Sequence, residues 1–328
     1  MKGNLLRQGL ALAITIGALG ASISGAAAQA WPAKPIRIVI PFPPGGSVDS
    51  FGRVFAAKLQ DLLKTPVVIE NKGGAGGNVG ANAVAKSPPD GYTILLHTNG
   101  QAISPAIYKT LPFDPVHDFI RVAEVATTST VIVVNKDLPV KTFGEFVAYA
   151  KSHPGKLNYG STGVGNALHL TMEMVKHATG IDVQMVPFTG DAPLFTAMIG
   201  GEIQSALVPT TAAKAFIDSG AIRAIAVTTA ERVPTMPTIP TVMEQGLPDF
   251  SVTGWLALFA PVGTPRDIVD RLAKESLAAV ASPELKGPLV NLTLDPASAG
   301  PDAFEKIYLS DVARFKQVVK DANIPLQD

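Results

Sequence analysis

Two stretches of this chain share one local design, in which a β-rich run leads through a glycine-rich turn into an amphipathic helix. The first stretch spans residues 36–48 and the second spans residues 157–167. A helix N-terminus presents unpaired N–H groups and a partial positive charge, so each turn can hold an anion without a basic side chain. The pair predicts one anion-binding turn in each of two domains, with a small anion between them. Each turn taken alone also fits an ordinary strand–loop–helix connection.

The rest of the chain alternates between strand-like and helix-like runs. Further strands are predicted over residues 66–70, 92–97, 131–134, 183–186, 205–208, 223–228 and 255–260, and helices over residues 143–152, 168–179, 266–280 and 301–321. Residues 98–101 are predicted to form a polar tip after a strand, and Ser47 is expected to cap the first helix. This alternation predicts an α/β fold with an open, largely parallel sheet in each domain.

The first thirty residues are predicted to be a cleaved signal peptide. Lys2 and Arg7 give a basic start, an apolar run follows over residues 10–19, and Ala28 and Ala30 fit an A-x-A site with cleavage after Ala30. The apolar run is too short to span a bilayer. Export to the periplasm is therefore expected, and an uncleaved N-terminal anchor is the competing interpretation.

Charge and cysteine content narrow the functional class. The chain has 27 basic and 27 acidic residues, so removal of Lys2 and Arg7 leaves a slightly acidic protein without the basic surface that a nucleic-acid partner requires. There is no cysteine, which excludes disulfides and thiolate metal sites. Export without disulfides fits a periplasmic protein whose stability comes from its hydrophobic core. Residues 31–328 suffice for two domains, and none of their segments is apolar enough to be transmembrane.

Several short motifs occur in order along the chain. They are IPFPPGG at 40–46, ENKGGAGGN at 70–78, PDGYT at 89–93, LPFDP at 111–115, LNYGSTGVGN at 157–166, VPFTG at 186–190, GW at 254–255 and APVGTP at 260–265. Together they resemble the Bug-type solute receptors, the periplasmic substrate-binding proteins of tripartite tricarboxylate transporters. The resemblance covers essentially the whole chain after residue 30.

The resemblance implies a two-domain type II periplasmic-binding-protein fold, a Venus flytrap with a mixed, mostly parallel sheet flanked by helices in each domain. Residues 31–125 with 252–328 are predicted to form domain 1, residues 126–251 to form domain 2, and the ligand cleft to lie between them. Such a receptor acts as a monomer without a cofactor, a metal or enzymatic activity. It captures a dicarboxylate, tricarboxylate, acidic amino acid or aromatic acid and delivers it to the membrane permease. The alternative is a sensor subunit that presents the bound acid to a signalling partner.

The predicted ligand contacts lie in loops at the carboxyl ends of strands. They are Phe42, Gly45, Gly46, Ser47, Asp49, Asn99, Ser161, Thr162, Gly165, Asn166, His169, Thr189, Gly190 and Asp191. Backbone N–H groups are expected to dominate at Gly46, Ser47 and residues 165–168.

Three positions leave alternatives open. Asp49 and Asp191 either have structural roles, stabilised in a first helical turn, or order water or a ligand ammonium group. Phe188 stands where the family often has Tyr, so it either packs or lines the pocket and favours an apolar ligand body. Asn166 stands where the family often has Ser, and its side chain can still cap the helix. The glycine loop at 73–78 is either a third contact or a structural turn.

Other chemistries fit less well. His169, Glu173 and His177 share one helix face, but the outer pair lie about 12 Å apart along the axis, so one ion could take only two of them. We expect His169 to pack or bond near its loop, and Glu173 and His177 to be solvated. Tyr159 stands where a G-x-S-x-G nucleophile elbow needs glycine, and the chain lacks a nucleotide-binding fingerprint.

Overall fold

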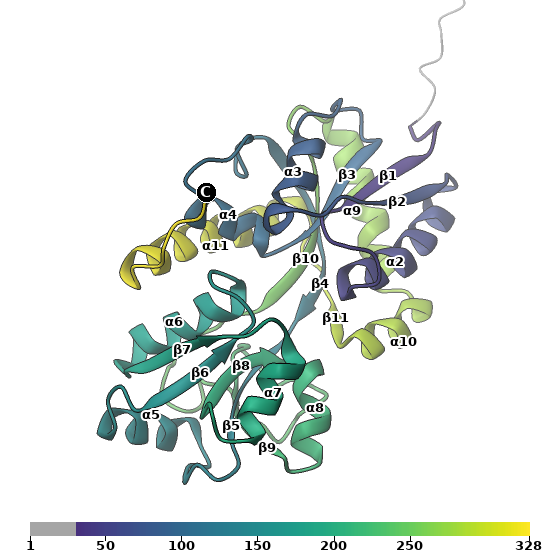
Figure 1. The fold of residues 1–328 in the computed structure, drawn as a ribbon. Coiled ribbons are helices and arrows are strands. Elements are labelled where there is room, and N and C mark those ends of the chain that lie inside the picture. The colour runs from purple at the N-terminus through teal and green to yellow at the C-terminus, as the bar shows by residue number, and fades with distance from the viewer. Residues whose placement is uncertain (1–30) are drawn as a thin grey trace, which may run out of the picture. The chain divides into compact units, whose positions relative to one another are not determined.

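Two β-sheets with flanking helices organise the chain (Figure 1). The computed structural model describes residues 31–328, and the predicted signal peptide with its cleavage site at Ala30 lies outside these described residues. Residues 34–328 form one compact unit by their contacts. Within the described part of the chain, no helix has the length and apolar character needed to cross a membrane.

The first sheet has six strands in the order β11-β4-β10-β3-β1-β2. Its strands are β1 (Ile36–Ile40), β2 (Val67–Asn71), β3 (Thr93–Thr98), β4 (Phe119–Thr128), β10 (Gly254–Pro261) and β11 (Leu294–Pro296), and its helices are α2 (Ser47–Leu63), η1 (Ala75–Gly77), α3 (Asn78–Ala85), α4 (Gly100–Ile107), α9 (Arg266–Val280), α10 (Pro283–Leu292) and α11 (Pro301–Asp321). Strand β1 runs parallel to β2 and β3, whereas β10 runs antiparallel to β3 and β4. We call this sheet with its helices the first lobe.

The second sheet has five strands in the order β7-β6-β8-β5-β9. Its strands are β5 (Thr130–Asn135), β6 (Leu157–Ser161), β7 (Val183–Pro187), β8 (Ser205–Pro209) and β9 (Ile222–Val227), and its helices are α5 (Phe143–Ser152), α6 (Ala167–Thr179), α7 (Asp191–Ile199) and α8 (Thr210–Asp218). Strand β6 is parallel to β7 and β8, and β5 is antiparallel to β8 and β9. We call this sheet with its helices the second lobe. The predicted α/β class with mixed sheets is confirmed.

The chain passes between the sheets twice. It crosses at Ser129, between β4 and β5, and returns between β9 and β10. The first sheet is therefore assembled from two stretches that lie far apart in the sequence, whereas the second sheet comes from the single stretch between the crossings. The assignment of residues 31–125 with 252–328 to one domain and residues 126–251 to another stays a prediction.

Two expectations about local structure are wrong. In place of the expected polar tip at 98–101, Thr98 ends β3, Asn99 is the N-cap residue and α4 begins at Gly100. This helix contains Pro105, a residue that normally argues against a helix interior. Ser47 does not cap α2, because Gly46 holds the N-cap position and no side chain makes a capping hydrogen bond there. By contrast, α9 and α11 begin and end at the predicted residues.

Trp255 is the centre of the first lobe's core. Its ring lies 5.3 Å from that of Phe304 and 6.0 Å from that of Phe259, and all three side chains are buried. The indole Nε1 donates a 2.8 Å hydrogen bond to Asp311 on α11. A buried Trp needs such a partner for its N–H, so Asp311 fixes the position of the ring.

Two carboxylates lie close to this core. Asp311 also accepts a bond from Arg314, while Glu124 on β4 is 8% exposed and forms no ion pair with any of residues 31–328. Burial, followed by the charge of Asp311, raises the pKa of Glu124 to about 7. The folded protein therefore holds a proton on Glu124 at pH values where the unfolded chain has lost it.

This raised pKa predicts a pH-dependent stability. Between about pH 4.5 and 7 the folded state binds more protons than the unfolded state, so the free energy of unfolding falls as the pH rises through this window. Above about pH 7 Glu124 is ionised in both states, and the free energy of unfolding falls no further on its account. Glu124→Gln removes the charge, so we expect the variant to gain about 1–3 kcal/mol over the wild type between pH 5 and pH 8. Urea unfolding at both pH values measures the difference, and a difference that does not change with pH contradicts the assignment.

Candidate functional site

The first glycine loop joins β1 to the N-terminus of α2. Its last residue, Gly46, has extended backbone angles (φ −74°, ψ 170°) and leads directly into the helix. Ser50 N bonds to Gly46 O at 2.9 Å, which closes the first helical turn. Because no side chain caps this turn, its first N–H groups are left for solvent or a ligand. Pro43 to Ser47 are exposed, as a binding loop requires.

Asp49 braces this loop from behind. Its carboxylate accepts hydrogen bonds from Gly45 N at 2.8 Å, Arg53 Nε at 3.0 Å and Asn71 Nδ2 at 2.9 Å. Asn71 also donates to Phe42 O at 3.1 Å. The bond from Arg53, together with those from Gly45 and Asn71, outweighs burial and lowers the pKa of Asp49 to about 2. The side chain is thus a buried anion whose bonds are made within the protein, which agrees with the structural alternative.

The second glycine loop joins β6 to α6 and repeats this arrangement. Gly165 N donates to His169 Nδ1 at 2.8 Å, and Asn166 caps α6 by accepting a 2.8 Å bond from His169 N. The Ser161 hydroxyl donates to Gly163 O at 3.2 Å. His169 is buried, and burial lowers its pKa, so the ring is neutral and its Nδ1 can accept. The predictions that Asn166 caps the helix and that His169 packs or bonds near its loop are confirmed.

The two loops therefore use the same device. In each, the N–H of a glycine at positive φ, Gly45 (+85°) or Gly165 (+76°), bonds to a buried side chain four residues later. The acceptor, Asp49 or His169, is the third residue of the helix that follows. This resembles a capping box shifted by one residue. It ties down the glycine amide that precedes the helix and leaves the next amides free, so the expected ligand contact at Gly165 N is already engaged in this structure.

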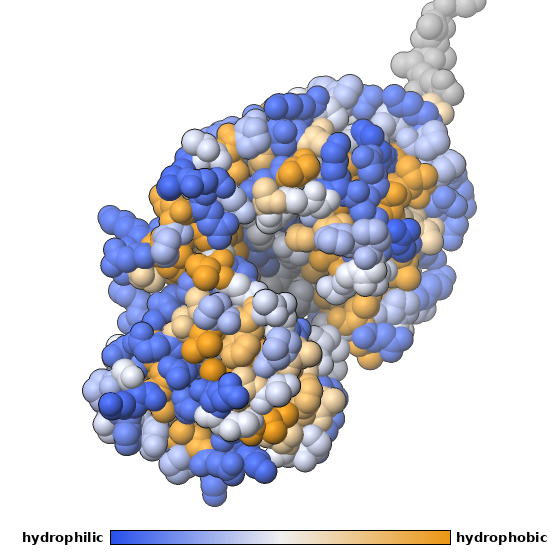
Figure 2. Space-filling model, in the orientation of Figure 1, coloured by the Kyte–Doolittle hydropathy of each residue, from blue (hydrophilic) through white to orange (hydrophobic). Residues whose placement is uncertain are grey.

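Three cavities lie between the lobes, in the hollow that Figure 2 shows on this face of the molecule. The first, of about 410 Å³, is lined by Phe42, Gly76, Thr98, Gly100, Ile103, Ser104, Ile107, Tyr108, Val164, Gly165, Asn166, Ala167, Leu168 and Gln327. The second, of about 180 Å³, is lined by Thr98, Asn99, Thr128, Thr130, Ala167, Leu168, Thr171, Pro209, Val252, Thr253, Gly254, Trp255 and Phe315. The third, of about 300 Å³, is lined by Ser47, Val48, Thr98, Thr128, Ser129, Asp191, Pro209, Thr211, Ala212, Leu256, Leu292, Thr293 and Leu294. Thr98 lines all three, and we call them together the cleft.

The structure brings several predicted site residues to this cleft. Those that line it are Phe42, Ser47, Asn99, Gly165, Asn166 and Asp191. Those that do not are Gly45, Gly46, Asp49, Ser161, Thr162, His169, Thr189 and Gly190. Asp49, Ser161 and His169 are buried behind the loops, whereas Thr189 is exposed at the end of β7. The amide of Asn99 bonds to Trp255 N at 2.7 Å and to Asp311 at 3.4 Å, so it is held by the core.

Some cleft residues could not be expected from sequence patterns. Thr98 is the last residue of β3, and Ile107 is the last residue of α4, a helix that the sequence did not predict. Tyr108 directly follows α4. Gln327 comes from the segment after α11 and has no local signal. Phe188 is half-buried, packs against the second lobe's core and lines none of the three cavities, which favours the packing alternative.

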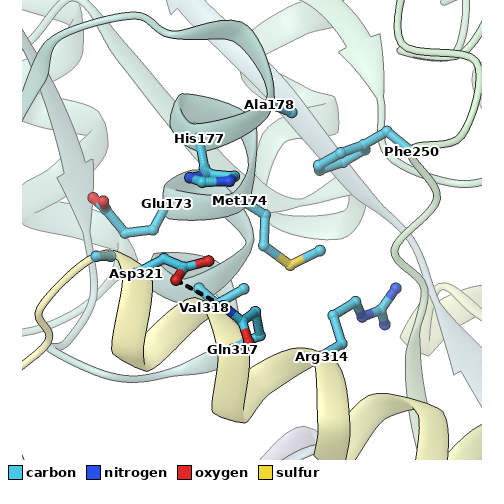
Figure 3. A pocket seen from close by; sticks show the side chains of 10 residues that line it. Glu173, Met174, His177, Ala178, Phe250, Arg314, Gln317, Val318 and Asp321 are labelled. Atoms are coloured by element: carbon cyan, nitrogen blue, oxygen red, sulfur yellow. Dashed lines mark hydrogen bonds between the residues drawn. The ribbon is translucent and has the colours of Figure 1, made fainter.

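A further cavity, of about 450 Å³, lies between α6 and α11 (Figure 3). It is lined by Glu173, Met174, His177, Ala178, Phe250, Arg314, Gln317, Val318, Asp321 and Ala322, none of which is a predicted ligand contact. Apart from Phe250, its walls are formed by α6, α11 and the residue that ends α11, whose amides bond within the helix, and the two carboxylates of Glu173 and Asp321 belong to the lining. Arg314 already donates to Ser251 O and Asp311. This cavity is therefore poorly suited to a carboxylate.

The expectation that Glu173 is solvated is wrong, because its carboxylate is bonded within the protein. It accepts a 2.6 Å bond from the Tyr159 hydroxyl and a 2.7 Å bond from Lys176. Its side chain is 11% exposed, whereas His177 is exposed as predicted. Over residues 31–328 there is no group of three or more His, Cys, Asp or Glu side chains arranged to hold a metal ion.

Comparison with known proteins places these features in one family. A family model described as the tripartite tricarboxylate transporter family receptor matches residues 51–324. BugT from Bordetella pertussis is 32% identical over 302 residues, which is 92% of this chain and 93% of BugT. A solved structure of the R. palustris protein Rpa4515 with adipate is 33% identical, with a TM-score of 0.75, over 90% of this chain and 100% of that chain. MatC from Rhodopseudomonas palustris with bound malate is 29% identical, with a TM-score of 0.70, over 88% of this chain and 100% of that chain.

The brace on the first loop predicts the effect of changing Asp49. Asp49→Asn removes the charge that pairs with Arg53 and weakens the bond from Gly45 N, so we expect a looser loop and about tenfold weaker carboxylate binding. Titration calorimetry at pH 7 measures the affinity, with Asp61→Asn on the exposed face of α2 as the matched control. Equal or tighter binding by the Asp49 variant would show that this carboxylate opposes the ligand instead of bracing the loop.

Proposed function

The chain belongs to the tripartite tricarboxylate transporter family of receptors, and from this premise we propose that it captures a small carboxylate and passes it to a membrane permease. The observation that carries the proposal is the pair of helix N-termini at the cleft. Ser47 and Val48 of α2, and Asn166 to Leu168 at the start of α6, line parts of the same cleft. A carboxylate between them would receive N–H groups and helix dipoles from both lobes.

Membership in this family settles the broad class. The chain is an extracytoplasmic solute receptor and not an enzyme, and its fold is that of the periplasmic binding proteins, as predicted. Cleavage after Ala30, the delivery of the ligand to permease subunits and the action of the receptor as a monomer are parts of our proposal. They would place the mature receptor in the periplasm, where it meets both its ligand and its permease.

The charge of the cleft supports binding through the backbone. Among the described residues that line the three cavities, Asp191 alone carries a charge, and no Lys or Arg is present. An anion in such a place must be held by main-chain N–H groups, hydroxyls and side-chain amides, because burying it without donors is costly. The lining residues at the two helix N-termini, Ser47 and Asn166 to Leu168, together with the hydroxyl of Thr98, could supply such donors.

The apolar part of the lining suggests the ligand's other features. Phe42, Ile103, Ile107 and Leu168 face the first cavity, and its volume of about 410 Å³ is within the range of small-ligand sites. Adipate in the R. palustris relative and malate in MatC are both short dicarboxylates. We propose a mono- or dicarboxylate with a compact, partly apolar body for this chain. An acidic amino acid or aromatic acid also belongs to the proposed range.

Closure of the cleft is the proposed mechanism of capture. The two crossings, at Ser129 and between β9 and β10, would act as the hinge between residues 31–125 with 252–328 and residues 126–251. A ligand that contacts both loops binds the closed state better than the open state, and this difference in affinity is what drives closure.

The proposal predicts selection for the carboxylate group. Malate, adipate, glutamate and benzoate, each paired with its amide, form a suitable panel for titration calorimetry at pH 7. We expect at least one acid to bind, and its amide to bind at least about tenfold more weakly, since charge-assisted bonds are stronger than neutral ones. Amides that bind as tightly as their acids would contradict an anion site.

A second prediction isolates one backbone donor. Gly46 has φ −74°, which suits proline, so Gly46→Pro removes the N–H with little strain. Gly46→Ala keeps the N–H, and its Cβ would lie 3.7 Å from Pro43 O, an ordinary contact. We expect the proline variant to lose about tenfold or more in affinity and the alanine variant to stay near the wild type. Thermal unfolding checks that both fold, and unchanged affinity in a folded proline variant would remove this amide from the site.

A further inference from the structure

The segment after α11 returns along α4 to the cleft. Gln327 N donates to Ile107 O at 2.7 Å, and Lys109 N donates to Gln327 O at 2.9 Å. These two backbone bonds form an isolated parallel bridge between Tyr108 and Gln327. The backbone of this segment is thereby fixed to the first lobe whatever side chain stands at position 327.

The side chain of Gln327 reaches the second lobe from this anchor. Its Nε2 donates to Val164 O, in the second glycine loop, at 3.3 Å. The same loop contacts α4 beside it, because a Cβ added to Gly165 would lie only 1.7 Å from Ile107 Cδ1. Gly165 is thus needed both for its positive φ and for this close approach.

Gln327 and His169 hold the two ends of one peptide group. The C=O of Val164 accepts from Gln327, and the N–H of Gly165, in the same peptide, donates to His169. A peptide group is planar, so fixing both ends sets its orientation. Asn166, Ala167 and Leu168 follow this peptide directly and line the cleft, so its orientation sets the direction in which their backbone continues.

We propose that Gln327 is a positioning residue for the carboxylate site, acting across the two lobes on the second glycine loop. This inference rests on the proposed function. The bond from Gln327 holds the loop amides toward the ligand and links the loop to the first lobe, so it favours the arrangement in which both lobes contact the carboxylate. A neutral amide suits the position because it donates to a carbonyl without bringing charge to an uncharged cavity.

Two substitutions separate this role from simple packing. Gln327→Met keeps the length of the side chain but cannot donate. Gln327→Glu keeps the shape of the side chain but replaces the N–H donor with a carboxylate. It adds a negative charge to a cavity in which no described lining residue is charged. Leu326→Ala is the control, since Leu326 lies on the same segment and is 48% exposed. The backbone bonds of position 327 are unaffected in all three variants.

Calorimetry with the tightest-binding acid of the panel, at 20 and 200 mM NaCl, tests the inference. We expect about three- to tenfold weaker binding for Gln327→Met at both salt concentrations. We expect a larger loss for Gln327→Glu that shrinks at high salt, because salt screens the repulsion between the two anions. The melting temperatures of all three variants should match that of the wild type, and so should the affinity of Leu326→Ala for the acid.

Each result bears on one proposal at a time. Wild-type affinity in both Gln327 variants, with acid binding intact, would overturn the positioning role and leave the proposed function standing. Equal losses in Gln327→Met and Leu326→Ala would also overturn it, because they would point to general packing of the segment. Failure of the wild type to bind any acid of the panel would count against the proposed function itself.

Discussion

The arrangement of this protein depends on main-chain N–H groups at two helix N-termini that must stay unpaired and correctly aimed. Both loops solve this problem in the same way. A buried side chain at the third helical position, Asp49 or His169, accepts the N–H of the glycine that precedes the helix. Each bond is 2.8 Å long, and each fixes the turn without using the amides that come next. The chain thus braces its two proposed anion-binding loops with unrelated residues.

The two braces differ in charge, and their surroundings differ accordingly. Asp49 is an anion near the proposed anion site, but Arg53 and Asn71 bond to it and its charge is compensated behind the loop. His169 is kept neutral by burial, so it can accept a hydrogen bond without adding charge of either sign. Neither brace therefore places an unbalanced charge beside the proposed carboxylate site, and among the described residues that line the cleft Asp191 alone is charged.

Local sequence signals predicted much of the fold and the loops, but they did not predict contacts between distant segments. Asn166 was identifiable as a cap and α11 by its full extent, because both depend on neighbouring residues. The helix α4 was missed because Gly100 and Pro105 weaken its local signal, and packing against α11 outweighs that weakness. Gln327 reaches the cleft only through the return of the chain after α11. Nothing in the spacing of residues near it could have indicated this contact.

The central claim is that amides of both loops, and not an arginine or a metal, bind the carboxylate. Two-dimensional ¹H–¹⁵N NMR of the mature protein, titrated with a binding acid, tests this most directly. The account predicts large, saturable shifts for the amides of residues 46–48 and 166–168 together, with downfield proton shifts as they bond to the anion. Shifts confined to one loop, or to residues around the cavity between α6 and α11, would contradict it.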